Sequence, residues 1–267
     1  MRQRIITAIF FGAAMLGGVY GGKGSFMILC AIIIAGCLWE LLGLLLPEEP
    51  GKKFRRVWGI VVAMLPLLPI AENVFYFQPG MIYFLVFLTF ISFIVELFLS
   101  SKNPFQNIAC YLLGFFYICF PFVFLDWTVE GEDSHYSPNR VFGLLLLVWT
   151  NDTMAYFIGS QLGKHKLFER ISPKKTWEGT IGGGICTMLI AWGLSFYFKD
   201  FTTPQWVALA AVAAVFGTLG DLVESMLKRS VGVKDSGNLL PGHGGLLDRF
   251  DAFIFALPFY WFVLQII

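Results

Sequence analysis

Charged residues are scarce in this chain. They make up 14% of its 267 residues, whereas 57% of the residues are hydrophobic. A typical soluble domain has about 25% charged residues. A soluble protein of this length would not cover its surface with so few charges. The scarcity therefore excludes an ordinary soluble globular protein and favours a chain that lies in lipid.

A strong charge imbalance and a metal-binding cysteine pattern are also absent. The formal net charge is +1, so bulk electrostatics give no reason to expect a nucleic-acid partner. No CxxC spacing occurs, and the five cysteines all lie inside apolar runs, which is typical of small buried hydrophobes rather than of disulfides. The loop histidines His135 and His165 stand alone in sequence, and we interpret them as solvated.

Long apolar runs fill the chain instead. Residues 27–46, broken by one acid, are long enough to cross the roughly 30 Å hydrocarbon core of a bilayer as a helix. The runs are continuous, whereas a membrane barrel would alternate in segments of about ten residues. The basic start and the apolar residues 5–18 mimic a signal peptide, but further spans follow at once, so we interpret them as an uncleaved first helix.

The fold class expected is all-α, as a polytopic integral membrane protein with about nine transmembrane helices. Without a visible internal repeat, residues 1–267 are expected to form a single membrane domain. Its less specific N-terminal spans occupy 1–125, and the helices and loops that carry chemistry occupy 139–267. The expected helix cores are residues 5–22, 25–46, 57–77, 81–100, 105–125, 139–160, 177–198, 204–227 and 250–267.

The distribution of basic residues predicts the orientation. With nine spans, the N-terminus and the basic connectors 47–56, 161–176 and 228–249 lie on one side, which by the positive-inside rule is cytoplasmic. Of the 19 Lys and Arg residues, the other side holds only Lys23, Arg140 and Lys199, and its longest loop, 126–139, is acidic. We therefore expect a cytoplasmic N-terminus.

The densest polar stretch begins inside an apolar helix. Asp221, Glu224, Ser225 and Lys228 follow an i, i+3, i+4, i+7 spacing, so they share one helical face. Acids within a membrane are costly and usually face a cavity or a partner. An internal Glu224–Lys228 ion pair is the structural alternative, but it does not account for Asp221.

A glycine-rich segment follows, and then two more acids. Its glycines, Gly244 and Gly245 among them, let backbone amides approach an anion, although a flexible connector is the alternative interpretation. Asp248 and Asp251, spaced i, i+3, could simply offset a helix macrodipole. Held beside Asp221, they would form a hard-oxygen cluster suited to Mg²⁺ and a phosphate.

The connector before the seventh expected helix is basic. Lys174 and Lys175 could hold lipid headgroups or nucleotide phosphates, or could be ordinary positive-inside charge. Thr176 can cap the next helix, and we assign the GxxxG pair Gly179 and Gly183 to helix packing rather than to ligand binding. Glu40 and Glu96, each near the cytoplasmic end of an apolar helix, are interpreted as structural.

Together, these motifs resemble the CDP-diacylglycerol synthases (phosphatidate cytidylyltransferases). The signature covers residues 225–251, and a family-like helix and loop lie upstream at 149–164 and 172–179, whereas the first five spans match only in being apolar. The residues that carry the resemblance are Ser225, Lys228, Arg229, Lys234, Asp235, Pro241, His243, Gly244, Gly245, Asp248, Arg249 and Asp251, with Trp149, Asn151, Asp152, Tyr156, Lys174 and Lys175 upstream.

The resemblance implies cytidylyl transfer from CTP to phosphatidic acid, with loss of pyrophosphate, in the inner (cytoplasmic) membrane with the site facing the cytoplasm. It implies Mg²⁺ on Asp221 and Asp248, with Asp251 and Glu224 nearby, and the surplus of acids would fit a second, monovalent cation. Expected catalytic residues are Asp221, Asp248, Lys228, Arg229, Lys234 and His243; expected substrate-binding residues are Lys174, Lys175, Ser225, Arg249, Gly244, Gly245, Asn151 and Asp152. A homodimer is a hypothesis that rests on the GxxxG pair and the resemblance.

Three alternatives stay open at this point. Another CTP-dependent lipid enzyme, such as an ether-lipid cytidylyltransferase or a polyprenol kinase, would share these motifs, because the sequence says nothing about lipid tails. A transporter of an anionic solute usually shows inverted repeats and a midplane site, and neither is visible here. A scaffold without activity would carry a needlessly costly acid cluster.

Overall fold

The structure is a computed structural model that describes residues 2–67, 79–129, 135–242 and 244–267. The chain divides into two compact units. The first comprises Met1–Asp126 and Asp235–Leu247, and the second comprises Trp127–Lys234 and Asp248–Ile267. Among the described residues, helices dominate and the strands form one short hairpin, so the predicted all-α class is confirmed. The expectation of a single membrane domain stays a prediction.

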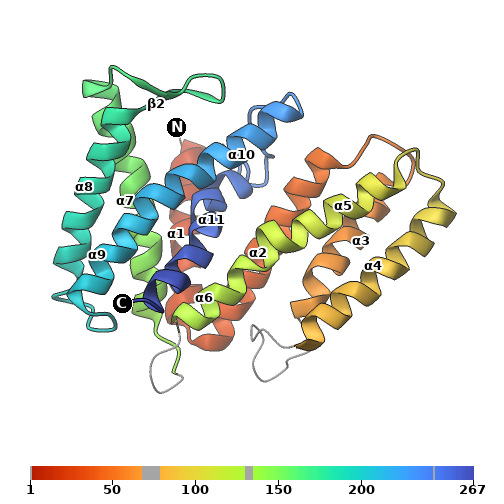
Figure 1. Cartoon of the computed structure of the whole chain (residues 1–267), viewed down its shortest axis with the longest axis horizontal. Coiled ribbons are helices and arrows are strands. Elements are labelled where there is room, and N and C mark those ends of the chain that lie inside the picture. The colour runs from red at the N-terminus through yellow and green to blue at the C-terminus, as the bar shows by residue number, and fades with distance from the viewer. Residues whose placement is uncertain (1, 68–78, 130–134, 243) are drawn as a thin grey trace. The chain divides into compact units, whose positions relative to one another are not determined.

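The described residues of the first half of the chain are mainly helical (Figure 1). The elements are α1 (Arg2–Tyr20), α2 (Lys23–Leu45), α3 (Lys52–Met64), the 3₁₀ turn η1 (Leu65–Leu67), α4 (Pro79–Leu99), α5 (Pro104–Gly114), the π turn η2 (Phe115–Cys119) and α6 (Pro121–Val129). Residues 68–77 of the third expected span lie outside the described residues.

The second half adds the hairpin and five more α-helices. The elements are α7 (Pro138–Leu162), β1 (Lys166–Phe168), β2 (Ser172–Thr176), α8 (Trp177–Leu194), α9 (Thr203–Val212), the π turn η3 (Ala213–Gly217), α10 (Thr218–Ser230) and α11 (Leu247–Leu264). The strands pair antiparallel, with Lys166 opposite Thr176. Figure 1 shows this hairpin at one end of α7 and α8.

Five helices within the described residues are long and apolar enough to cross a membrane. They are Lys23–Leu45, Gly80–Leu99, Pro104–Val129, Pro138–Leu162 and Thr203–Ser230. The protein is therefore an integral membrane protein. Helices occupy part or all of each expected span within the described ranges, but the count of nine transmembrane helices stays a prediction.

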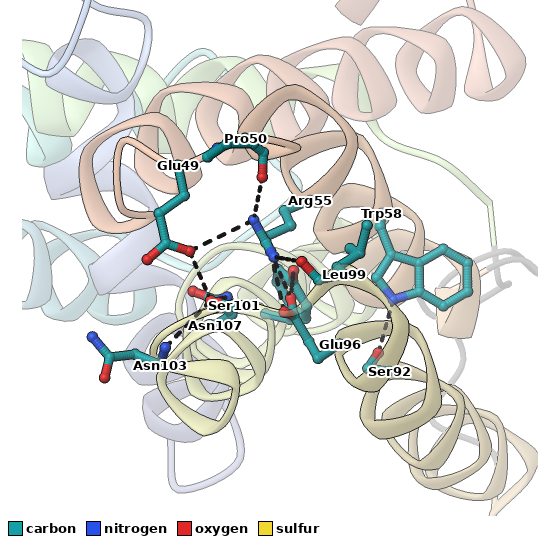
Figure 2. Close-up of polar contacts among 11 residues, drawn as sticks. Glu49, Pro50, Arg55, Trp58, Ser92, Glu96, Leu99, Ser101, Asn103 and Asn107 are labelled. Carbon is teal, nitrogen blue, oxygen red and sulfur yellow. Dashed lines mark hydrogen bonds and ion pairs between the residues drawn. The ribbon is translucent and has the colours of Figure 1, made fainter.

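One basic residue that the charge count assigned to a connector is buried inside the first unit. Figure 2 shows Arg55, on α3, facing Glu96, on α4: its Nε lies 3.1 Å from both carboxylate oxygens. Tyr111 of α5 donates to the same carboxylate over 3.0 Å, and Arg55 also donates to the carbonyl of Pro50 over 2.9 Å. Because the pair is buried, loss of either partner would leave an uncompensated charge. This network ties three helices together, which agrees with a structural role for Glu96.

The predicted GxxxG packing is confirmed in the second unit. A Cβ added at Gly183 would lie 2.8 Å from the backbone nitrogen of Ala155 on α7, and one at Gly179 would lie 2.8 Å from the Cα of Gly159. Without side chains at these positions, the backbones of α7 and α8 approach closely. The predicted cap is also present, because Thr176 Oγ1 accepts from the amide of Gly179 over 3.2 Å. The cap fixes where the hairpin ends and α8 begins.

Candidate functional site

A charged cavity of about 660 Å³ lies within the second unit. Its wall brings together residues from α7, β1, β2, α8, α10 and α11. Four acids and four lysines contribute: Asp152, Asp221, Asp248, Asp251, Lys166, Lys174, Lys175 and Lys228. The cavity therefore joins the predicted basic loop to the predicted acidic helices.

A glycine on α10 allows the acids of two helices to meet. A Cβ at Gly220 would lie 3.0 Å from the carbonyl oxygen of Asp251 and 3.2 Å from the Cα of Ala252. The absence of that Cβ lets α10 pass close to the first turns of α11, which brings Asp221 near Asp251. The π turn η3 precedes α10 directly, and such turns often occur at functional sites.

Three carboxylates form a compact cluster. Oxygen atoms of Asp221, Glu224 and Asp251 all lie within 4.8 Å of one another. Glu224 is fully buried, and its Oε1 has no hydrogen-bond partner among the described residues. Buried carboxylate oxygens are the donors that hard divalent cations prefer. The donor set and the unsatisfied oxygen therefore fit a divalent metal ion.

The predicted face of α10 exists, with Lys228 at its end. Ser225 Oγ donates to Asp221 Oδ1 over 3.2 Å, and Lys228 forms an ion pair with Glu224, as the structural alternative expected. The Lys228 ammonium also donates to Asp248 Oδ1 over 2.6 Å. Asp248 thus lies against a lysine at the cavity wall, whereas the three-carboxylate cluster contains Asp251. The predicted metal pair of Asp221 and Asp248 stays a prediction.

The basic side of the cavity comes mainly from the hairpin. Lys175 forms an ion pair with Asp221, and Lys174 lines the cavity beside it. Lys166, opposite Thr176 in the hairpin, also lines the cavity, as does Thr180. Our sequence reasoning missed Lys166 and Thr180 as site residues. The basic segments 164–166 and 174–175 are close in sequence. Pairing them as an antiparallel hairpin would have placed Lys166 near the site.

The hairpin is held to α8 by a carboxylate outside the five spanning helices. Glu178 accepts hydrogen bonds from the amides of Lys164 and His165, over 3.0 and 3.2 Å, and contacts His165 Nδ1 at 2.6 Å. The His165 contact, followed by the Lys164 amide, lowers the pKa of Glu178 to about 2. His165 is exposed, as the sequence indicated, but it also has a partner in Glu178.

Several predicted site residues do not line this cavity. Arg229 donates to the carbonyl of Val233 over 2.7 Å, and Lys234 and Arg249 are exposed. Asn151 is buried behind the wall, where its Nδ2 lies 3.4 Å from Thr218 Oγ1. Gly244 and Gly245 belong to the first unit, and His243 lies outside the described residues.

Comparisons with known proteins find matches along nearly the whole chain. A profile of the Cytidylyltransferase family matches residues 2–267. The phosphatidate cytidylyltransferase of Staphylococcus aureus (strain COL) is 36% identical over 262 residues, which cover 97% of this chain and 96% of that protein. The phosphatidate cytidylyltransferase of Bacillus subtilis (strain 168) is 35% identical over 278 residues, which cover 100% of this chain and 98% of that protein.

Proposed function

The chain belongs to the cytidylyltransferase family, and on that premise we propose that it transfers the cytidylyl group of CTP to phosphatidic acid. The products are CDP-diacylglycerol and pyrophosphate, for phospholipid synthesis. The observation that carries the proposal is the cavity of the second unit, where three clustered carboxylates lie next to lysines from a hairpin. Nucleotidyl transfer needs both kinds of charge in one place.

The reaction needs positioning and charge neutralisation more than covalent catalysis. A phosphate oxygen of phosphatidic acid attacks the α-phosphorus of CTP. The bond from that phosphorus to the bridging oxygen breaks, and pyrophosphate leaves with the electron pair. The nucleophile is already an anion, so no general base is required. The protein must hold two polyanions close together and in line.

The lysines at the cavity wall supply the cationic side of the site. Lys174 and Lys175 extend from β2, and Lys166 extends from the paired strand. We assign them to phosphate oxygens of CTP and of the lipid, because ammonium groups make charge-assisted hydrogen bonds to phosphate. Arg229, Lys234 and Arg249, with His243, remain proposed phosphate contacts from the family resemblance.

The acids supply the metal side. Asp221, Glu224 and Asp251 would hold Mg²⁺, and Asp248 is linked to Glu224 through Lys228. When bound, the ion would neutralise phosphate charge and stabilise the leaving pyrophosphate. Ser225 orients Asp221 through its hydroxyl. Lys228 offsets the charges of Glu224 and Asp248, which limits their mutual repulsion.

The proposed location is the cytoplasmic membrane, with the cavity on the cytoplasmic side, where CTP is present. The charge distribution supports this orientation. A cysteine placed at Ser172, in the hairpin, should resist an impermeant thiol reagent added to intact cells and should react after lysis. Labelling of that cysteine in intact cells would show that the hairpin faces the outside, opposite to the proposed orientation. The homodimer hypothesis stays a prediction.

One assay tests the function and its nearest rivals. Purified protein is incubated with CTP and Mg²⁺, and with phosphatidic acid, an ether-linked phosphatidate or a polyprenol in parallel. We expect pyrophosphate and a CDP-lipid with phosphatidic acid. Release of CDP with a phosphorylated polyprenol would indicate a kinase instead, and turnover with only the ether lipid would change the substrate. No turnover with any of the lipids would contradict the proposal.

A further inference from the structure

A buried acid of the first unit contacts the connector that leads into α11. Glu40, on α2, is 2% exposed. Its Oε2 accepts from Ser236 Oγ over 3.1 Å and from the amide of Leu247 over 2.8 Å, and its Oε1 accepts from the amide of Leu239 over 3.4 Å. All four residues belong to the first unit. One carboxylate therefore contacts Ser236, Leu239 and Leu247 of connector 236–247, which is about 200 positions away in the chain.

The contact with Leu247 is a helix cap supplied by a distant residue. Leu247 is the first residue of α11, and the first amides of a helix have no partner within it. Local capping normally comes from Ser, Thr, Asp or Asn, but the preceding residues are Gly245 and Leu246, which have no side-chain acceptor. The Glu40 carboxylate fills this role, and its charge suits the positive end of the helix dipole.

Two glycines allow α2 and the connector to approach closely. A Cβ at Gly237 would collide with the Glu40 carboxylate, and a Cβ at Gly36 would collide with the side chain of Leu246. The contact at Gly237 therefore needs a residue without a side chain, whereas at Gly36 the Leu246 side chain would have to shift. The close contact of Glu40 with the connector therefore depends on one glycine in α2 and one in the connector.

We propose that Glu40 is a positioning residue for the reaction: by fixing connector 236–247 and capping α11, it sets the backbone that runs directly into Asp248. The inference rests on the proposed function. Gly244 and Gly245 lie within the held connector, and Asp248 follows the capped Leu247 in the chain. Asp248 in turn holds Lys228 at the cavity wall. The contacts of Glu40 agree with the structural role expected from the sequence, and the proposed role in positioning goes beyond it.

Hydrogen exchange and turnover, measured on the same full-length protein, test the proposal. In Glu40→Ala, deuterium uptake by peptides from 236–247 should speed up by at least about tenfold, because capped and bonded amides lose their acceptor. The kcat per folded molecule should fall by about tenfold or more, with a much smaller change in the KM for CTP. Glu40→Gln keeps a carbonyl oxygen for Ser236 and Leu247, so it should restore most of the protection and most of the kcat.

Matched controls separate positioning from general stability. Glu96→Gln changes another buried acid of the first unit, so it should lower thermal stability without faster exchange in 236–247. Ser236→Ala removes one of the three hydrogen bonds to Glu40 and should give a smaller rise in exchange and a smaller fall in kcat. If Glu40→Ala does not fold, this graded variant decides the question.

Faster exchange with an unchanged kcat would overturn the positioning role, and so would a loss of kcat with unchanged exchange. Either result, with an active wild-type protein, leaves the proposed function intact. A wild-type protein that is inactive on CTP and phosphatidic acid would overturn the function, and the positioning role with it. The exchange data would still report the Glu40 contacts in that case.

Discussion

The Lys228 ammonium lies 2.6 Å from Asp248 Oδ1, and it also forms an ion pair with Glu224. The relationship matters because Glu224 belongs to the three-carboxylate cluster, whereas Asp248 does not. Lys228 therefore links Asp248 to an acid of the cluster. The tests of the site ask whether Asp248 itself contributes to the metal site.

The first prediction assigns the metal ligands. Asp221→Asn and Asp251→Asn should each lower activity by orders of magnitude, and extra Mg²⁺ should restore part of it, because a weakened site fills by mass action. Asp248→Asn should also lower activity, but without a shift in the Mg²⁺ concentration needed for half-maximal rate. The measurement is a Mg²⁺ titration of each purified variant.

The family resemblance placed Asp248 with Asp221 as a ligand, so the titration also decides between the two assignments. A Mg²⁺ shift in Asp248→Asn as large as that in Asp221→Asn would favour the resemblance over the geometry. Near-normal turnover in a stable Asp221→Asn variant would end the metal assignment at that residue.

The second prediction concerns Lys175, which forms an ion pair with Asp221. Lys175→Ala should raise the KM for CTP or for phosphatidic acid, because it removes a phosphate partner. It should also lower the Mg²⁺ concentration needed for half-maximal rate, because a competing cation has left Asp221. Steady-state kinetics at several Mg²⁺ concentrations measure both effects.

Lys174→Ala is the matched control, because Lys174 lines the same cavity, whereas among the described residues the ion pair with Asp221 is made by Lys175. It should raise the KM without a change in Mg²⁺ dependence. Unchanged kinetics in both variants would mean that these lysines only help to set the membrane orientation.

The third prediction is the pH response of the hairpin. The pKa of Glu178 is lowered from 4.5 to about 2, first by the His165 contact and then by the Lys164 amide. A lowered pKa means that the stabilisation is fully present above the unfolded value and is lost as the pH falls toward 2. Pepsin cleavage at the exposed Phe168 should therefore rise steeply between about pH 4 and pH 2.

In Glu178→Gln, pepsin should cleave the hairpin already at about pH 4, because an amide cannot replace the charged acceptor. Glu169→Gln changes an exposed acid of the same connector and should behave like the wild type. Equal cleavage of wild type and Glu178→Gln at every pH would contradict a role for this carboxylate in holding the hairpin.

The fourth prediction concerns the packing of α7 against α8. Gly183→Ala should destabilise the protein by about 1–3 kcal/mol, because the new Cβ overpacks a closed helix contact. The added methyl group would meet the backbone of Ala155. Gly193→Ala, on the same helix but in open space, should be neutral or stabilising, since alanine favours helix. Thermal unfolding in detergent compares the two, and equal melting temperatures would contradict the packing role.

The sequence alone determined which segments are helices and which faces of them carry charge. Continuous apolar runs leave a helix as the conformation that pairs every backbone group in lipid, and helical periodicity put Asp221, Ser225 and Lys228 on one face. The cap at Thr176 and the close helix packing at the glycines of α8 were also predicted from the sequence. These interactions follow from local geometry or from side-chain size.

Only the tertiary structure decided which charges meet. Arg55 counted as a topology signal in the sequence, yet it is buried on Glu96, because the partner lies 41 residues away on another helix. Asp248 and Asp251 are one helical turn apart, and the close passage of α10 at Gly220 brings Asp251 to Asp221 while Asp248 meets Lys228. The capping of Leu247 by Glu40 spans 207 residues. Such pairings depend on how whole helices pack, and neither periodicity nor spacing along the chain encodes that.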